Sequence, residues 1–270
     1  MNTMLKKILR KVFGIIWLIR IPIVSVSILL STTALHYSGI YVYSGLLPLT
    51  CIIIAGYIQN DIFDLRIDMI AAPSRPIPSG MVSLQEAKIL YSLFVGLGLI
   101  SGITLNNILF LVYLIVVLVF FFVYTKYCKS NWLLKNLFTA ITSTSVIFIP
   151  LFYGGRITRD SILLGFTAFF FTLGREIFMD IRDQKGDQII PRVKRIHNTP
   201  AFILSFVFLL ISRIVAEYLL HTSLYRYLSY VIIFFVFFNL FKGKKSNYWI
   251  GSEMMKIIFI IDLSLMCFLS

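Results

Sequence analysis

Six aspartates form two copies of the spacing Asp-x-x-Asp-x-x-x-Asp, and they are the side chains best suited to chemistry. The copies consist of Asp61, Asp64 and Asp68, then Asp180, Asp183 and Asp187, with each position recurring 119 residues later. Only two aspartates lie elsewhere in a chain that is 59% hydrophobic. Because carboxylates are costly near lipid, their concentration in two matched clusters predicts a metal site.

On a helix, residues three, four and seven apart share a face, so each cluster aims several oxygens in one direction. The two stripes are Tyr57, Asn60, Asp64 and Asp68, and Glu176, Asp180, Asp183 and Asp187. Like charges at this spacing repel, and a bound cation compensates for that repulsion. Oxygen ligands favour Mg²⁺, which typically completes its coordination with substrate phosphate. The pattern therefore predicts Mg²⁺ ions around a diphosphate.

A plainer interpretation treats these acids as solvating residues at helix ends. Arg66, Arg182 and Lys185 lie close enough in sequence to neutralise them. A single Asp-x-x-x-Asp would favour this interpretation, whereas the matched pair favours the metal site. The three cysteines and three histidines are far apart in sequence, so they predict neither a disulfide framework nor a thiolate or imidazole metal site.

Membrane-spanning helices are the elements that must position the two clusters. Stretches of roughly 20 mostly apolar residues recur along the chain, and each can cross a ~30 Å hydrocarbon core. Nine spans are predicted, at 14–36, 41–60, 88–105, 107–125, 133–153, 160–180, 198–220, 225–241 and 249–269. Because no soluble segment is long enough for a second domain, residues 1–270 are predicted to form one all-α domain in the membrane.

The distribution of positive charge orients these spans. Most of the 25 lysines and arginines fall on one side, and only Arg156, Arg159 and Arg226 fall on the other. The positive-inside rule makes the richer side and the N-terminus cytoplasmic, with the C-terminus outside a multi-pass protein of the cell membrane. Topology thus explains the net charge of +13 without a nucleic-acid partner. Since four spans separate the clusters, both are expected on the cytoplasmic side, where they can converge.

The residues that flank both clusters form longer motifs. Asn60 to Asp68 reads Asn-x-x-x-Asp-x-x-x-Asp, and Arg75 to Gly80 reads Arg-Pro-x-x-Ser-Gly. Together they resemble the first signature of the UbiA-type intramembrane prenyltransferases, and Arg175 to Asp187 resembles the second. The wording is most similar to the branch that contains archaeal digeranylgeranylglyceryl phosphate synthases and the homogentisate and chlorophyll prenyltransferases.

This resemblance implies Mg²⁺-dependent transfer of a prenyl group from an allylic diphosphate to a hydrophobic acceptor, aromatic or lipid-like, in a cavity among about nine helices. Mg²⁺ would neutralise the leaving diphosphate while the apolar helices exclude water. The metal-binding residues that it implies are Asn60, Asp64, Asp68, Asp183 and Asp187, and the four aspartates among them are the catalytic residues. Asp61 and Asp180 are expected to support them from an outer shell.

The resemblance also implies residues that contact the substrate. The candidates for the diphosphate and the reacting prenyl group are Asn60, Arg75, Lys126, Lys129, Tyr124 and Tyr153. For each lysine, an equal alternative is an ordinary positive charge on a cytoplasmic loop. For each tyrosine, an equal alternative is a position at the membrane interface. Arg175 and Glu176 are expected to pair and to stabilise the wall of the site.

Two other functions share some of these features. A terpene cyclase on the same scaffold would ionise the diphosphate in the same way but capture the cation within one substrate. A cation or phosphate transporter could use the acidic clusters as a gate, although two motifs on one side and the Arg75 to Gly80 signature argue against it. Within the spans, Arg213 and Glu217 are spaced to pair, and Asp262 has no obvious partner in the sequence.

Overall fold

The computed structural model describes residues 3–129, 131–187, 198–219, 230 and 245–268. Within this part of the chain every element is a helix, which confirms the all-α class. Among the described residues, seven segments are long and apolar enough to cross a membrane, namely Met4–Tyr37, Leu46–Phe63, Leu84–Ile103, Ile108–Cys128, Trp132–Tyr153, Arg159–Ile181 and Pro200–Glu217. They coincide with the first seven predicted spans.

The structure describes most of one of the last two predicted spans and little of the other. The span predicted at 225–241 lies outside the described residues, apart from residue 230. The one predicted at 249–269 coincides with helix α11, Lys245–Phe268. The count of nine spans and the cytoplasmic position of both motifs therefore stay predictions.

The described chain divides into two compact units, and each is considered by itself. The N-terminal unit contains residues 3–28, 43–129 and 186–187, and the C-terminal unit contains residues 29–42, 131–185, 198–219, 230 and 245–268. Helix α2, Ile21–Tyr37, begins in the first unit and ends in the second. The prediction of one domain for residues 1–270 stays a prediction.

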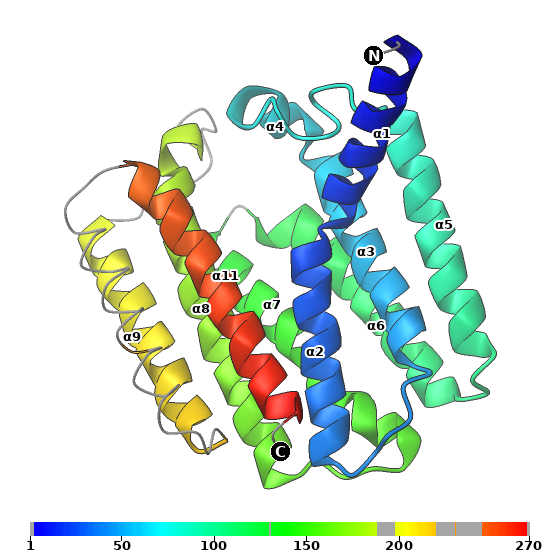
Figure 1. The fold of residues 1–270 in the computed structure, drawn as a ribbon, viewed down its shortest axis with the longest axis vertical. Helices are drawn as coiled ribbons and strands as arrows, with labels where there is room; N and C mark the ends of the chain where they lie inside the picture. Colours follow the sequence, from blue (N-terminus) through cyan, green and yellow to red (C-terminus); the bar gives the residue numbers. More distant parts are fainter. Residues whose placement is uncertain (1–2, 130, 188–197, 220–229, 231–244, 269–270) are drawn as a thin grey trace. The chain divides into compact units, whose positions relative to one another are not determined.

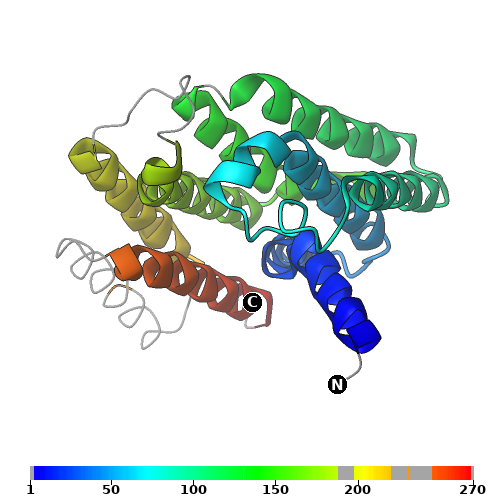
Figure 2. The same cartoon turned by 90° about the horizontal axis from the view of Figure 1, so that it is seen from above.

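In the N-terminal unit, helix α3 (Leu46–Phe63) packs against α5 (Leu84–Ile103) and α6 (Ile108–Val123), as Figure 1 shows. Glycines permit this close approach. A Cβ at Gly56 would lie 2.4 Å from the ring of Phe121, and one at Gly98 would lie 2.7 Å from the side chain of Ile52. Small residues at helix crossings are typical of packing in membranes, because they let backbones approach. The short helix α4 (Leu65–Ala71) lies across the end of α3 (Figures 1 and 2).

The predicted first span is broken into two helices at Arg20. Helix α1 runs from Thr3 to Ile19 and α2 from Ile21 to Tyr37, and Arg20 between them has a left-handed backbone with φ of 57°. Pro22 has no N–H to continue the hydrogen bonds of α1, but it fits the first turn of a new helix. The prediction of a single helix over 14–36 was therefore wrong at this position, and Figure 1 shows the bend.

Helix α5 begins four residues before the predicted span because its start is capped. The Ser83 hydroxyl accepts a hydrogen bond from the Glu86 N–H at 3.2 Å, and the Glu86 carboxylate accepts one from the Ser83 N–H at 3.0 Å. This reciprocal arrangement is a capping box, which satisfies two backbone donors at once. The Ser-x-x-Glu spacing is visible in the sequence, but the prediction from hydrophobic length alone placed the start at residue 88.

The C-terminal unit is built from α7 (Trp132–Thr144), the 3₁₀ segment η2 (Ser145–Tyr153), α8 (Arg159–Asp187), α9 (Asn198–Glu217) and α11. At Gly174 the backbones of α8 and α9 approach closely, and the Ser205 hydroxyl donates to the Gly174 carbonyl at 2.7 Å. Phe178, Leu209 and Met255 form a buried apolar cluster that joins α8, α9 and α11.

A buried ion pair also joins α9 to α11. Arg213 Nη1 donates to Asp262 Oδ1 at 2.6 Å, and the two side chains are 2% and 8% exposed. The sequence indicated no partner for Asp262, and the structure shows that its partner is an arginine on another helix. In an apolar environment such a pair is maintained because either charge alone would be far more costly.

Removing one member of this pair is expected to destabilise the protein strongly. Arg213→Met should lower the free energy of unfolding by about 3–5 kcal/mol, because it leaves the Asp262 carboxylate buried without its cation. The double variant Arg213→Met/Asp262→Leu should recover most of that loss, since it removes both charges. Thermal unfolding in one detergent would measure both variants, and a double variant less stable than the single one would contradict this account.

Candidate active site

The first aspartate motif lies where α3 ends and α4 begins. Asn60 and Asp61 belong to the last turn of α3, Asp64 joins the two helices, and Asp68 lies in α4. The Asp64 N–H donates to the Asn60 carbonyl at 2.9 Å and the Asp68 N–H donates to the Asp64 carbonyl at 2.8 Å, so helical hydrogen bonding continues through the junction. The predicted stripe therefore persists although the helix changes direction.

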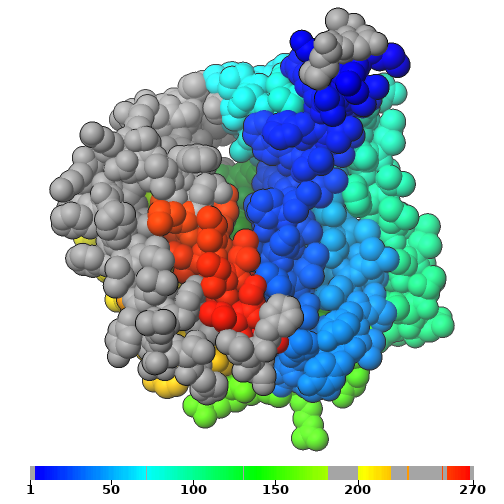
Figure 3. All heavy atoms as spheres, in the orientation of Figure 1, coloured from blue at the N-terminus to red at the C-terminus, as the bar shows by residue number. Residues whose placement is uncertain are grey.

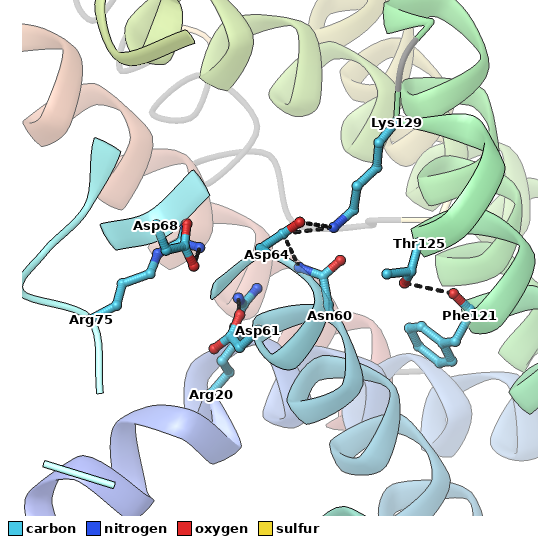
Figure 4. A network of polar contacts seen from close by, with 9 residues as sticks. All are labelled: Arg20, Asn60, Asp61, Asp64, Asp68, Arg75, Phe121, Thr125 and Lys129. Atoms are coloured by element: carbon cyan, nitrogen blue, oxygen red, sulfur yellow. Dashed lines mark hydrogen bonds and ion pairs between the residues drawn. The ribbon is translucent and has the colours of Figure 1, made fainter. Parts of the chain in front are cut away.

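Asp64 is at the centre of this cluster, as Figure 4 shows. Its Oδ2 accepts a hydrogen bond from Asn60 Nδ2 at 3.0 Å, which confirms that these residues share a face. Lys129 Nζ contacts both carboxylate oxygens at 2.6 Å. Lys129 was predicted as a diphosphate ligand, and it comes from a segment 65 residues away in sequence. The structure thus brings a candidate metal ligand and a candidate diphosphate donor together.

The segment that carries Lys129 has a π-helical turn, η1, from Tyr124 to Cys128. Such turns insert an extra residue into a helix and often occur at functional sites. The Lys129 ammonium lies 5.7 Å from the centre of the Tyr124 ring, within the range of a cation–π contact. Lys126 is exposed, and its ammonium lies over the rings of Phe122 and Tyr127 instead. Of the two predicted lysines, Lys129 is the one at the carboxylates.

Asp68 pairs with Arg75, another residue predicted from the sequence. Arg75 Nη1 donates to Asp68 Oδ2 at 2.6 Å, and Asp68 is 5% exposed. Burial raises the pKa of the Asp68 carboxyl, and the adjacent guanidinium of Arg75 opposes that rise. Burial lowers the pKa of Lys129 as well, and the charge of Asp64 opposes that change. Each charge in the cluster is therefore stabilised by its partner.

Asp61 points to a different partner. It is 5% exposed and forms an ion pair with Arg20, whose guanidinium also lies 5.2 Å from the centre of the Tyr57 ring. Figure 4 shows this pair beside, but separate from, the contacts of Asp64. Asp61, Asp64 and Asp68 thus each have one basic partner, so the cluster is close to neutral rather than strongly negative.

The oxygens of the cluster fit a hard cation. Asn60 Oδ1 is buried and has no hydrogen-bond partner, although Asn60 Nδ2 is bound to Asp64. A buried acceptor without a donor is costly, and a cation would remove that cost. Within the described part of the chain, no three His, Cys, Asp or Glu side chains gather closely enough to hold a metal. Mg²⁺ here would therefore use Asn60, Asp64 and Asp68 together with oxygens from water or substrate.

In the C-terminal unit, the second motif begins with an analogous arrangement. Asp180 is 7% exposed and pairs with Lys135, and its Oδ2 accepts a hydrogen bond from Asn136 Nδ2 at 2.9 Å. Asn136 is fully buried, and its Oδ1 has no hydrogen-bond partner, like that of Asn60. Asparagine, aspartate and lysine thus meet at each motif, although in the second the asparagine comes from α7.

The remaining predicted residues of this unit are placed as follows. Arg175 Nη1 donates to Glu176 Oε1 at 2.7 Å, which confirms the expected pair. Tyr153 is half-buried at the end of η2, next to Gly154, whose φ is 73°. The backbone of α8 continues through Asp187, but the side chains of Asp183 and Asp187 lie outside the described residues, so their metal-binding role stays a prediction.

Comparison with protein families identifies the chain. The model of the UbiA prenyltransferase family matches residues 17–249, which include both aspartate motifs and the basic residues that contact them. The chain belongs to this family. The resemblance of the two motifs is thereby confirmed.

This UbiA family member is similar to archaeal proteins named digeranylgeranylglyceryl phosphate synthase. Over 146 residues it is 35% identical to the protein from Sulfurisphaera tokodaii. The matched region covers 53% of this chain and 52% of the relative. It is 38% identical over 157 residues to that of Methanosphaera stadtmanae, with 55% of each covered. The chain therefore spans about half the length of the curated relatives it matches.

Solved structures show the same fold. The TM-score is 0.67 with a UbiA homologue from Aeropyrum pernix, at 18% identity, with 91% of this chain and 98% of the other covered. It is 0.60 with a UbiA homologue from Archaeoglobus fulgidus bound to GPP and Mg²⁺, at 16% identity, with 96% and 99% covered. At these identities the likeness concerns the fold alone.

Among the described residues of this UbiA protein, three basic residues that contact buried aspartates were not named as site residues from the sequence. They are Arg20, Lys135 and Arg213, which contact Asp61, Asp180 and Asp262. Each pair joins residues at least 41 positions apart, so no local spacing indicates it. The sequence did hold one signal for these pairs, namely the position of the basic residues. A basic residue inside an apolar span needs an acidic partner.

Proposed function

We propose that this protein transfers a prenyl group from an allylic diphosphate to a hydrophobic acceptor in the membrane, with Mg²⁺ as the cofactor. One arrangement supports this most directly: oxygen ligands and cationic donors alternate around Asp64 and Asp68. Asn60, Asp64 and Asp68 would hold the metal, while Lys129 and Arg75 are placed to bind diphosphate oxygens as charge-assisted donors. A site for a metal diphosphate needs both kinds of group side by side.

The chemistry follows from these contacts. Bound Mg²⁺ would act as a Lewis acid on the leaving diphosphate, so that the allylic C–O bond can break. Lys129 and Arg75 exchange their carboxylate partners for diphosphate oxygens and stabilise the same developing charge. Tyr124, whose ring already faces the ammonium of Lys129, presents a π surface suited to positive charge on the prenyl group. Asp183 and Asp187 are the predicted metal ligands of the second motif.

For the acceptor, we propose an amphipathic lipid with a glyceryl phosphate head. The basis is the similarity to proteins named digeranylgeranylglyceryl phosphate synthase, which extends over about half of their length. The reaction would take place at the cytoplasmic face of the cell membrane, with the N-terminus inside and the C-terminus outside. This orientation rests on the asymmetric distribution of basic residues.

Purified protein is expected to form product only when a prenyl diphosphate, an acceptor and Mg²⁺ are all present. Geranylgeranyl diphosphate would be tested with a glyceryl phosphate lipid and with an aromatic acceptor, and products would be identified by mass spectrometry. Chelation with EDTA should stop the reaction, and added Mg²⁺ should restore it, because the metal completes the site. A cyclic hydrocarbon formed without any acceptor would instead identify a terpene cyclase and overturn the proposal.

A further inference from the structure

One side of helix α1 contacts the loop that carries Arg75, which is termed here the Arg75 loop (residues 72–83). Arg10 Nη2 donates to the Ser79 carbonyl at 2.8 Å, and Lys11 pairs with Glu86 just beyond the loop. The closest approach is at Gly14, where a Cβ would lie 2.6 Å from Cβ of Met81. Glycine at this position therefore allows the helix to lie directly against the loop.

The Arg75 loop is held together by its own backbone hydrogen bonds. The Ser79 N–H donates to the Arg75 carbonyl at 2.9 Å, and the Val82 N–H donates to the Pro76 carbonyl at 3.1 Å. Two prolines, Pro76 and Pro78, further restrict its conformation. A movement at Met81 is therefore expected to reach Arg75, whose guanidinium contacts Asp68.

The bend at Arg20 sets the direction in which α1 leaves α2. A left-handed backbone at a residue other than glycine costs roughly 1–3 kcal/mol, so surrounding contacts must maintain it. Here the contacts are the ion pair with Asp61 and the ring of Tyr57, 5.2 Å from the guanidinium. The first aspartate of the motif thus connects the bend to the helix that carries Asn60 and Asp64.

The opposite side of α1 is apolar and open. Its exposed residues are Leu5, Ile8, Leu9, Val12 and Ile16, each between 45% and 50% exposed. Figure 3 shows α1 at the surface of the molecule. Lipid is the expected neighbour of such a face in a membrane protein. The loop-facing side of α1 is therefore the one specialised for contact with protein.

We propose that α1 is a positioning element for the prenyl diphosphate: Gly14 and Arg10 hold the Arg75 loop in place, and the bend at Arg20, maintained by Asp61, holds α1 against that loop. The proposal rests on the proposed function, in which Arg75 binds the diphosphate. Asp61 and Arg20 act on the substrate through this chain of contacts rather than by touching it.

Gly14→Ala tests the proposal with Gly96→Ala as its matched control. Both changes add one methyl group to a helix, but a Cβ at Gly96 meets no atom within 4 Å. Gly14→Ala is expected to raise KM for geranylgeranyl diphosphate about tenfold, because small displacements of binding groups are costly, while KM for the acceptor is unchanged. Gly96→Ala should leave both values unchanged. Binding of geranylgeranyl thiolodiphosphate with Mg²⁺ should weaken by the same factor.

Arg20→Gly provides a second test that adds no atoms. Glycine accepts the left-handed backbone, so this variant removes the contacts to Asp61 and Tyr57 without adding strain. It should also raise KM for the diphosphate and leave KM for the acceptor unchanged. If the wild type binds the thiolodiphosphate and both variants bind it equally well, the positioning role is wrong. If the wild type does not bind it, the proposed function itself fails.

Discussion

Replacing Asp64 with alanine is expected to lower prenyl transfer by about a thousandfold, because it removes a charged ligand of the metal that activates the leaving group. The variant also removes the carboxylate that Lys129 and Asn60 contact. Both effects act on the prenyl diphosphate. The factor by which kcat/KM for this substrate falls should therefore be much larger than the factor by which KM for the acceptor rises. Steady-state kinetics at saturating Mg²⁺ would measure the change.

The control for this variant is Asp160→Ala, which removes an exposed carboxylate at the start of α8, outside both motifs. Its activity should match that of the wild type. Asp64→Asn is a second comparison, since it keeps the size of the side chain but loses its charge, and it should be nearly as defective as alanine. Full activity in Asp64→Asn would show that this carboxylate does not hold the metal.

Replacing Lys129 with methionine is expected to lower kcat/KM for the prenyl diphosphate by about a hundredfold, because a cationic donor to the leaving group is lost. Methionine keeps most of the apolar stem and leaves Asp64 without its basic partner. An unpaired carboxylate attracts cations, so Mg²⁺ should bind the variant more tightly in the absence of diphosphate. The two effects have opposite signs, which a loss of folding would not produce.

Two other lysines serve for comparison with Lys129. Lys126 is exposed and lies over the rings of Phe122 and Tyr127, so Lys126→Met should have a much smaller effect. Lys88, exposed on α5, is the control for the loss of a charge that is predicted to be cytoplasmic, and Lys88→Met should be fully active. If Lys126→Met were the more defective of the two candidates, the assignment of Lys129 to the diphosphate would be wrong.

The sequence was informative wherever a property is local. Hydrophobic length predicted the first seven spans, and the motif from Asn60 to Asp68 predicted the shared face that the hydrogen bond between Asn60 and Asp64 confirms. The capping box at Ser83 is also local, although the predicted span did not take it into account. These features depend on neighbours within one or two helical turns, so the residues themselves specify them.

Features that depend on how helices rotate against one another were not predictable from one sequence. Lys135 reaches Asp180 from a separate helix, and Lys129 reaches Asp64 only after a π-helical turn. A shift of one residue would turn either lysine about 100° around its helix and away from its partner. The bend at Arg20 was hidden for a related reason, because the contacts that maintain it come from α3.

The two motifs are similar in a way that the spacing alone does not reveal. Asp61 and Asp180, the first aspartates of the two copies, are both buried and both paired with a basic residue from a distant segment of the chain. The two copies therefore share the spacing of their aspartates and also the presence of a basic partner for the first aspartate. Because Asp64 and Asp68 also have basic partners, this similarity does not separate supporting aspartates from metal ligands, and the outer-shell role of Asp61 and Asp180 stays a prediction.

The buried pair between Arg213 and Asp262 has a consequence for how the protein is made. Synthesis proceeds from the N-terminus, so α9 with its arginine emerges well before Asp262 of α11. Until then the charge of Arg213 has no Asp262 to neutralise it in the bilayer. The final packing of α9 is thus expected to wait for α11, the last described helix, which brings the carboxylate of Asp262 to Arg213.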